Sequence, residues 1–281
     1  GELDNTFFVC DKLTFRGTQM KKILAIAYNT YREAIRDRIL YGFLFFAISI
    51  ILFSLVLGKL SINQQIRTTI DVGLAGISLF SVLIAIFIGI NLLNKEIQKR
   101  TIYPILSKPV GRHAYLLGKF GGIAMVLVVQ IALMLAVFLP LIVLQGGEIT
   151  FGLLTAVVLI FFETLMVIAM AMFFTSFSSP FLSGIFCLGL FVAGRSADLI
   201  AELGRQKELV SLAPLFEGVS VVLPNFYLFY PSGKIVEGAF ATVHAQFIST
   251  GYLYSAIAYS LICTASFLVA AMLIFRRRDF I

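Results

Sequence analysis

Long apolar runs, separated by short polar and basic stretches, constrain the fold of this chain more than any other feature. An α-helix rises about 1.5 Å per residue, so about 20 apolar residues are needed to cross a hydrocarbon core about 30 Å thick. Such runs predict transmembrane helices over residues 40–58, 72–93, 120–144, 151–175, 181–200 and 251–275. The predicted fold class is therefore an all-α polytopic membrane protein with six transmembrane helices.

The fourth and fifth spans come from one apolar run that is too long for a single helix. Between residues 149 and 194 the only charged residue is Glu163. Residues 176–180, with the sequence Ser-Phe-Ser-Ser-Pro, favour a turn and a helix end. They therefore divide the run into two spans.

The composition excludes other classes of protein. Hydrophobic residues make up 59% of the chain and charged residues 13%, against about 25% charged in an average soluble protein. Lys and Arg, the source of the net charge of +7, gather at the ends of apolar runs, which is a membrane pattern and not a nucleic-acid groove. The cysteines and histidines form no disulfide framework or metal-ligand cluster. We expect neither a nucleic-acid partner nor a bound metal.

Basic residues also predict the orientation. Their densest clusters are residues 20–38, 95–119 and 276–278. An even number of spans places all three clusters on one side, which the positive-inside rule makes the cytoplasm. Both termini are then cytoplasmic, and residues 59–71 and 145–148 lie outside.

The N-terminal part divides at Met20. Residues 1–19 are expected to be an added or upstream extension, with a cytoplasmic arm as the alternative. Residues 20–41 predict an amphipathic helix lying in the membrane interface, because Leu24, Tyr28, Tyr31 and other apolar side chains share one face. The alternative is a helix continuous with the first span.

A short polar segment between the second and third spans predicts a surface helix over residues 102–108. Thr101 is a suitable N-cap, Pro104 fits the first turn, and Pro109 with Gly111 ends the helix. One side of this helix is apolar, formed by Ile102, Ile105 and Leu106. A capped, partly apolar helix on a basic membrane surface suggests a docking element.

This segment resembles a motif of type-2 ABC exporter permeases, "E…GT(I/L)…LLS(K/R)PV.R…GK", closest to the multicopper-enzyme-maturation and gliding-motility group. The matching residues are Glu96, Thr101, Leu106, Ser107, Pro109, Arg112, Gly118 and Lys119. Arg100 stands where the family usually has Gly. The resemblance implies an elbow helix near residue 20, a single permease domain over residues 20–281, and a cytoplasmic coupling helix that docks on an ATP-binding subunit. The candidate coupling residues are Glu96, Arg100, Thr101, Ile102, Ile105, Leu106, Ser107, Pro109 and Arg112.

By this resemblance the chain is the membrane-spanning subunit of an ATP-driven exporter in a bacterial or archaeal inner membrane. Neither Gly118-Lys119 nor Gly233-Lys234 has the glycines and Ser/Thr of a phosphate loop, so ATP and Mg are expected on the partner and no enzyme activity on this chain. The implied assembly has two ATP-binding subunits and a second permease chain, in a homodimer. The resemblance also allows a periplasmic accessory protein as a further partner.

Glu163 is the candidate intramembrane site. A charge at the centre of a span costs about 2.5–3.5 kcal/mol, so the side chain must face protein or water rather than lipid. It either lines the translocation path or the dimer interface, or is structural, being protonated or hydrogen-bonded to a Ser, a Thr or Gln130. Arg195 and Asp198, three residues apart, predict a local ion pair at the headgroup level.

The segment 201–250 predicts short external helices between the last two spans. We expect a partly embedded helix over residues 209–223, an aromatic turn over 224–231 and an amphipathic helix over 233–246. The aromatic residues of the turn, which are Phe226, Tyr227, Phe229 and Tyr230, are expected to anchor the chain in the membrane interface.

Two rival functions remain. An ion- or proton-coupled carrier using Glu163 should show half-repeats, broken helices and several intramembrane charges, whereas the sequence indicates one such charge and no repeat. A membrane scaffold or sensor is the other. The sequence leaves the cargo open among a sulfur species, a lipid, a polysaccharide and a peptide.

Overall fold

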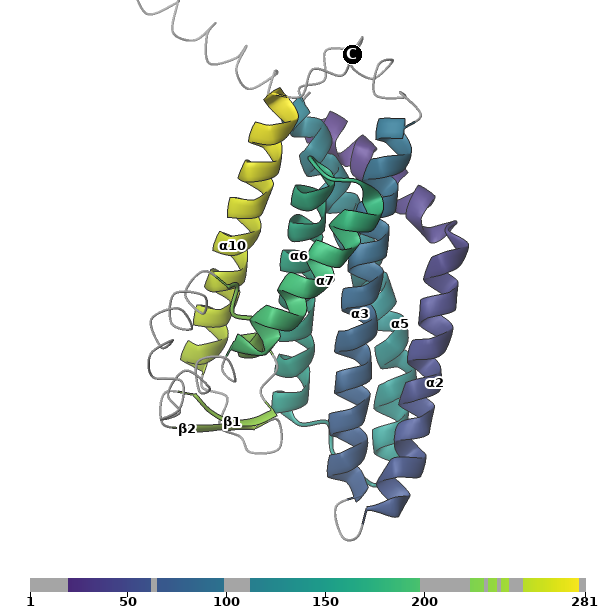
Figure 1. The fold of residues 1–281 in the computed structure, drawn as a ribbon. Coiled ribbons are helices and arrows are strands. Elements are labelled where there is room, and N and C mark those ends of the chain that lie inside the picture. Colours follow the sequence, from purple (N-terminus) through teal and green to yellow (C-terminus); the bar gives the residue numbers. More distant parts are fainter. Residues whose placement is uncertain are drawn as a thin grey trace, which may run out of the picture.

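The computed structural model describes residues 20–61, 65–98, 112–197, 223–229, 232–236, 239–242 and 250–277. Residues 20–35 are helical, and six further α-helices form an upright bundle (Figure 1). These are α2 (Arg38–Leu60), α3 (Gln65–Gln98), α5 (Arg112–Leu144), α6 (Phe151–Thr175), α7 (Pro180–Arg195) and α10 (Thr250–Arg277). The predicted extension over residues 1–19 lies outside the described part.

Among the described residues, five helices are long and apolar enough to cross a membrane: α2, α3, α5, α6 and α10. This confirms a polytopic membrane protein. Helix α7, which corresponds to the span predicted over 181–200, has only 16 residues, or about 24 Å of rise. Because that is less than a hydrocarbon core, the sixth crossing stays a prediction.

Helices α3 and α6 form the centre of the bundle, and their side chains supply much of the buried core. Close packing there needs a glycine at one point. A β-carbon on Gly73 of α3 would lie 2.1 Å from the ring of Phe138, a fully buried side chain of α5. The large ring of α5 therefore fits against α3 only because residue 73 has no side chain.

The helix over residues 20–35 is separate from α2. It ends in a turn in which the Asp37 N–H donates to the Ala34 carbonyl at 3.0 Å. Asp37 then caps α2, because its Oδ1 accepts the Ile39 N–H at 3.1 Å. Two side chains of the predicted apolar face, Leu24 and Tyr28, are exposed and point away from the protein core. This leaves them available to lipid.

The region between α7 and α10 differs from the sequence prediction. A 3₁₀ helix, η2 (Phe226–Phe229), occupies the predicted aromatic turn. The amphipathic helix predicted over 233–246 is wrong, because β1 (Ser232–Val236) and β2 (Ala239–Thr242) pair antiparallel. Each strand contains two β-branched or aromatic residues, which favour extended backbone over helix: Ile235 and Val236 in β1, and Phe240 and Thr242 in β2. The helix predicted over 209–223 falls almost wholly outside the described residues.

The bundle has two distinct ends (Figure 1). Helix 20–35, the C-terminal ends of α3 and α10 and the N-terminal end of α5 lie together at one end. The C-terminal end of α2, the N-terminal end of α3 and the connection between α5 and α6 lie at the other end, where β1 and β2 are also found. The helices that flank the predicted coupling segment, α3 and α5, therefore end and begin, respectively, at the end that carries helix 20–35.

Candidate functional site

Helix 20–35 is seated on two glycines of α5. A β-carbon on Gly118 would lie 2.8 Å from the Cβ of Ile26, and one on Gly122 would lie 2.5 Å from the backbone oxygen of Ala27. The small-residue pair Gly118 and Gly122 thus lets the two backbones approach closely, as such motifs do in membrane proteins. The opposing face of helix 20–35 is also small, since Ala27 and Thr30 are buried there.

Two ion pairs join the same end of the bundle. The Nζ of Lys119, on α5, lies 3.7 Å from Oε2 of Glu33, and the Lys119 side chain is only 3% exposed. The Nζ of Lys95, near the end of α3, lies 3.2 Å from Oδ2 of Asp37. Helix 20–35 and its junction with α2 are therefore tied both to α3 and to α5.

The predicted coupling residues are only partly placed. Glu96 lies in the last turns of α3, and Arg112 is the first residue of α5. The others lie outside the described residues: Arg100, Thr101, Ile102, Ile105, Leu106, Ser107 and Pro109. The described geometry therefore fixes the two helices on either side of the segment, while the coupling helix itself stays a prediction.

A second polar site lies inside the bundle, at Glu163. This residue is near the middle of α6 and is 0% exposed. The Nη1 of Arg195, from the last turn of α7, donates to its Oε1 at 2.7 Å, and the Oγ of Ser78, from α3, donates to its Oε2 at 3.0 Å. Three helices thus supply one buried charged cluster.

These contacts meet the expectation that the Glu163 side chain faces protein rather than lipid. A lone charge at this depth is costly, whereas a hydrogen-bonded pair offsets part of that cost. The guanidinium group of Arg195 also lies 5.7 Å from the ring centre of Phe191, within the range of a cation–π contact. Glu163 is therefore held by partners from two neighbouring helices.

The predictions for this cluster were partly correct. A serine does bind Glu163, but Gln130 does not, since its Nε2 instead lies 4.0 Å from Sδ of Met134. The partnership with Arg195 was missed, and Asp198 lies outside the described residues. The signal was present in the sequence, because Glu163 and Arg195 are the only charged residues between positions 149 and 197 and have opposite signs.

Irregular backbone lies beside this cluster. A β-carbon on Gly194 would lie 2.2 Å from the backbone oxygen of Pro224, and the rings of Phe191 and Phe226 are 5.1 Å apart. Phe226 and Phe229 are both 0% exposed. The prediction that these two rings anchor the chain in the membrane interface is wrong, because both are packed inside the bundle.

Helix α10 holds the same irregular segment from its other side. Phe229 packs with Leu159 of α6 and Ala256 of α10. The hydroxyl of Tyr259 accepts the Asn225 N–H at 3.0 Å, and the hydroxyl of Tyr252 donates to a backbone carbonyl of η2. Residues 223–229 are thus fixed between α6, α7 and α10.

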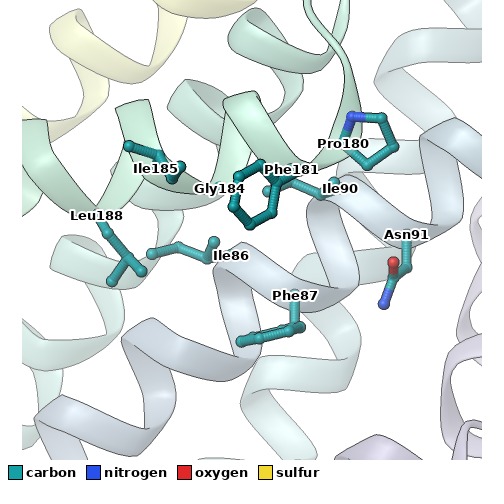
Figure 2. A pocket seen from close by; sticks show the side chains of 9 residues that line it. All are labelled: Ile86, Phe87, Ile90, Asn91, Pro180, Phe181, Gly184, Ile185 and Leu188. Atoms are coloured by element: carbon teal, nitrogen blue, oxygen red, sulfur yellow. The ribbon is translucent and has the colours of Figure 1, made fainter.

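An apolar cavity of about 320 Å³ lies between α3 and the first half of α7 (Figure 2). Its lining consists of Ile86, Phe87, Ile90, Asn91, Pro180, Phe181, Gly184, Ile185 and Leu188. Only Asn91 carries a polar side chain, and none of these residues is titratable. Among the described residues no group of three or more His, Cys, Asp or Glu could hold a metal ion. The cavity has the character of a packing gap or lipid-facing groove rather than a reaction site.

Comparison with known proteins identifies the family. The family model of ABC-2 family transporter proteins matches residues 24–280, which is nearly the whole chain. No curated protein matches the sequence. The match agrees with the apolar helices and with the resemblance of the segment around residue 106. The chain therefore belongs to the ABC-2 family of transporter proteins, and is a membrane-spanning permease subunit of the kind that works with an ABC ATP-binding subunit.

Proposed function

We propose that this permease subunit belongs to an exporter and receives the force of ATP hydrolysis through residues 101–109. The observation that carries the proposal is the linkage at one end of the bundle. Helix α5 holds helix 20–35 through Lys119 with Glu33, and α3 holds the junction of that helix with α2 through Lys95 with Asp37. A displacement of the segment would therefore act on α3, on α5 and on helix 20–35 together.

The route of the motion follows from the packing. Helix α3 lies at the centre and contacts α2, α5, α6 and α7, so a push at its end reaches most of the bundle. Helix 20–35 follows α5 because the seat at Gly118 and Gly122 leaves no gap between the two helices. ATP can drive this motion only if the ATP-binding subunit contacts the segment differently in its ATP-bound and ATP-free states. In this proposal the differing contacts are made by Ile102, Ile105 and Leu106.

The proposed assembly has two copies of this chain and two ATP-binding subunits, which hold ATP and Mg. The cytoplasm lies at the end of the bundle with helix 20–35, where Lys95, Lys119 and other basic residues gather. The chain is assigned to a bacterial or archaeal inner membrane, with both termini cytoplasmic. The resemblance over residues 96–119 supports assigning the chain to the group of multicopper-enzyme-maturation and gliding-motility permeases, and it leaves the cargo open.

The test is recovery of the ATP-binding subunit. Tagged chain is solubilised from its native membrane, and co-purifying ATPase subunits are measured by mass spectrometry and ATP turnover. Leu106→Asp and Arg112→Glu are expected to lose the subunit. The control Glu148→Arg changes an exposed charge near the opposite end and is expected to retain it. Full retention in both coupling variants would contradict the proposed docking segment.

One observation favours a carrier driven by an ion gradient. Arg195 adds a second charge at the depth of Glu163, beside irregular backbone, and both features are typical of ion-coupled transporters. The family match favours the ABC permease. Flux into proteoliposomes separates the two: ATP with the cassette subunit supports the proposal, whereas flux driven by a pH gradient without ATP supports the carrier.

A further inference from the structure

The charged cluster and the irregular segment meet at one place in the bundle. Helix α7 ends at Arg195, whose guanidinium reaches the middle of α6. Residues 223–229 pack against the end of α7 and against α6 and α10. Non-helical backbone is tolerated at membrane depth only where it is buried in protein or lines an aqueous cavity. Residues 223–229 meet the first condition, because their contacts with α6, α7 and α10 bury them in protein.

We propose that the Glu163–Arg195 ion pair and residues 223–229 form an outer latch, which is closed in this structure and must release for cargo to leave the bundle. The inference rests on the proposed transport function and assigns a role to residues outside the coupling segment. The latch is defined by the ion pair, by the contact of Gly194 with Pro224, and by the seat of Phe229 on α6 and α10.

The position of Phe229 shows which side the latch covers. Phe229 packs against Leu159, which precedes Glu163 by one helical turn of α6. Helix α6 begins at the end of the bundle that carries β1 and β2 and runs toward the end that carries helix 20–35 (Figure 1). The segment therefore covers Glu163 on the side facing away from the coupling end.

The ion pair and the segment are mechanically connected. Phe191 and Gly194 contact the segment, and Arg195 on the same helix end contacts Glu163. A movement of this helix end that breaks the ion pair must also pull on Phe226 and Pro224. Ion pair and segment are therefore expected to release together.

Three further features suit a pair that opens. Replacing a buried ion pair by apolar residues is often neutral or stabilising, so the presence of such a pair is weak evidence for a role in stability alone. Glu163 is fully buried while the Arg195 side chain is 29% exposed, so the arginine can leave the pair without losing all solvation. The first half of α7 also borders the cavity against α3 (Figure 2), which leaves room for the helix to tilt.

Thiol labelling tests the latch in the complex with its ATP-binding subunit. The native cysteines, which are Cys10, Cys187 and Cys263, are replaced by alanine. Ala256→Cys then places a thiol in the buried cluster that also contains Phe229 and Leu159, where the native residue is 2% exposed. The matched control is Ala47→Cys, at a fully buried position on α2. A charged, membrane-impermeant thiol reagent is added at the outer face.

The expected result is ATP-dependent exposure of position 256 alone. Minor states are commonly populated at about 0.1–10%, so turnover should raise the labelling rate at position 256 by about tenfold or more. Glu163→Gln should raise that rate without ATP, because an amide cannot form the ion pair. Glu163→Asp keeps the charge and should release less. Position 47 should stay unreactive throughout.

The outcomes separate the latch from the proposed function. The latch is overturned if the thiol at position 256 stays unlabelled both in Glu163→Gln and during ATP turnover that the permease stimulates. That result would leave the proposed transport function unaffected. If no ATPase subunit engages the chain, the proposed function fails, and the Glu163→Gln result alone decides the latch. If Glu163→Gln also exposes position 47, that variant is unfolded, and labelling of the chain with its native ion pair during ATP turnover decides: labelling of position 256 alone supports the latch, and none overturns it.

Discussion

Replacing Gly122 by alanine tests how helix 20–35 is seated on α5. The added β-carbon would lie 2.5 Å from the Ala27 oxygen and 2.6 Å from the Cβ of Thr30. Favourable van der Waals contacts between carbon atoms require a separation of at least about 3.5 Å. The two helices would therefore have to separate by roughly 1 Å. Because the nearest atom belongs to the backbone, a side-chain rotation alone cannot relieve this contact.

The magnitude follows from two opposing effects. Overpacking of a well-packed contact typically costs about 1–3 kcal/mol. Alanine has a better helix propensity than glycine by about 1 kcal/mol, which offsets part of this cost. The net expectation for Gly122→Ala is a loss of about 1 kcal/mol, which corresponds to about a fivefold shift of a two-state equilibrium.

Gly121→Ala is the matched control on the same helix. Its β-carbon would meet only the Cβ of Ala27, at 3.8 Å, so it gains the helix propensity without the clash. Both variants are made in a cysteine-free background with Ala34→Cys, whose native side chain is 1% exposed. Gly122→Ala should raise the labelling rate of this thiol about fivefold, and Gly121→Ala should not raise it. Equal rates in the two variants, or the reverse order, would refute this description of the seat.

Three further changes have defined expectations, each measured by thermal unfolding of the purified chain. Asp37→Ala should cost about 1 kcal/mol because α2 loses its N-cap, whereas Asp37→Asn keeps the cap, loses only the exposed ion pair and should cost less than about 1 kcal/mol; equal losses would contradict the cap. Phe229→Ala should cost about 3–5 kcal/mol because the ring is fully buried, and a loss below 1 kcal/mol would contradict that burial. Tyr259→Phe should cost about 1–2 kcal/mol because the Asn225 N–H loses its acceptor, and an unchanged melting temperature would count against this bond.

The spans were predictable because the bilayer imposes a length that a sequence displays directly. Helices α2, α3, α5, α6 and α10 contain five of the predicted apolar runs, although α5 begins eight residues before its predicted span, at Arg112 rather than residue 120. Hydropathy reports only the part of a helix that lipid covers, and the helix continues into polar residues beyond it. The break before Pro180 was also visible, because turn-forming residues interrupt the apolar run there.

The contacts between helices were not predictable in the same way. Glu163 required a partner, but which helix supplied it depended on α7 ending at Arg195 beside the middle of α6. A phenylalanine is equally compatible with the membrane interface and with the protein core, so residue type alone does not place Phe226 and Phe229. Their burial depends on Gly194 and on α10. A local sequence pattern indicates which secondary structure and environment a segment prefers. The partners of Glu163, Phe226 and Phe229 depend instead on residues that are distant in the sequence.

The candidate coupling residues illustrate a different limit. The motif around Leu106 was recognised from residue types and spacing, and the family match over residues 24–280 agrees with it. The structure places its flanks, α3 and α5, and reveals that α5 contacts helix 20–35 and that α3 contacts the junction of this helix with α2, which the sequence did not indicate. Gly118 and Gly122 were noted as a packing motif, but only the structure identifies the helix that packs on them.

The most direct test of the account is covalent capture of the ATP-binding subunit from the proposed docking segment. A photo-crosslinking amino acid is placed at position 106, and separately at position 186, where Phe186 is 42% exposed on α7. After illumination of native membranes, position 106 is predicted to yield an adduct with the ATPase subunit, and position 186 none. An adduct with lipid alone at position 106, in membranes where the ATPase subunit is present, would contradict the account.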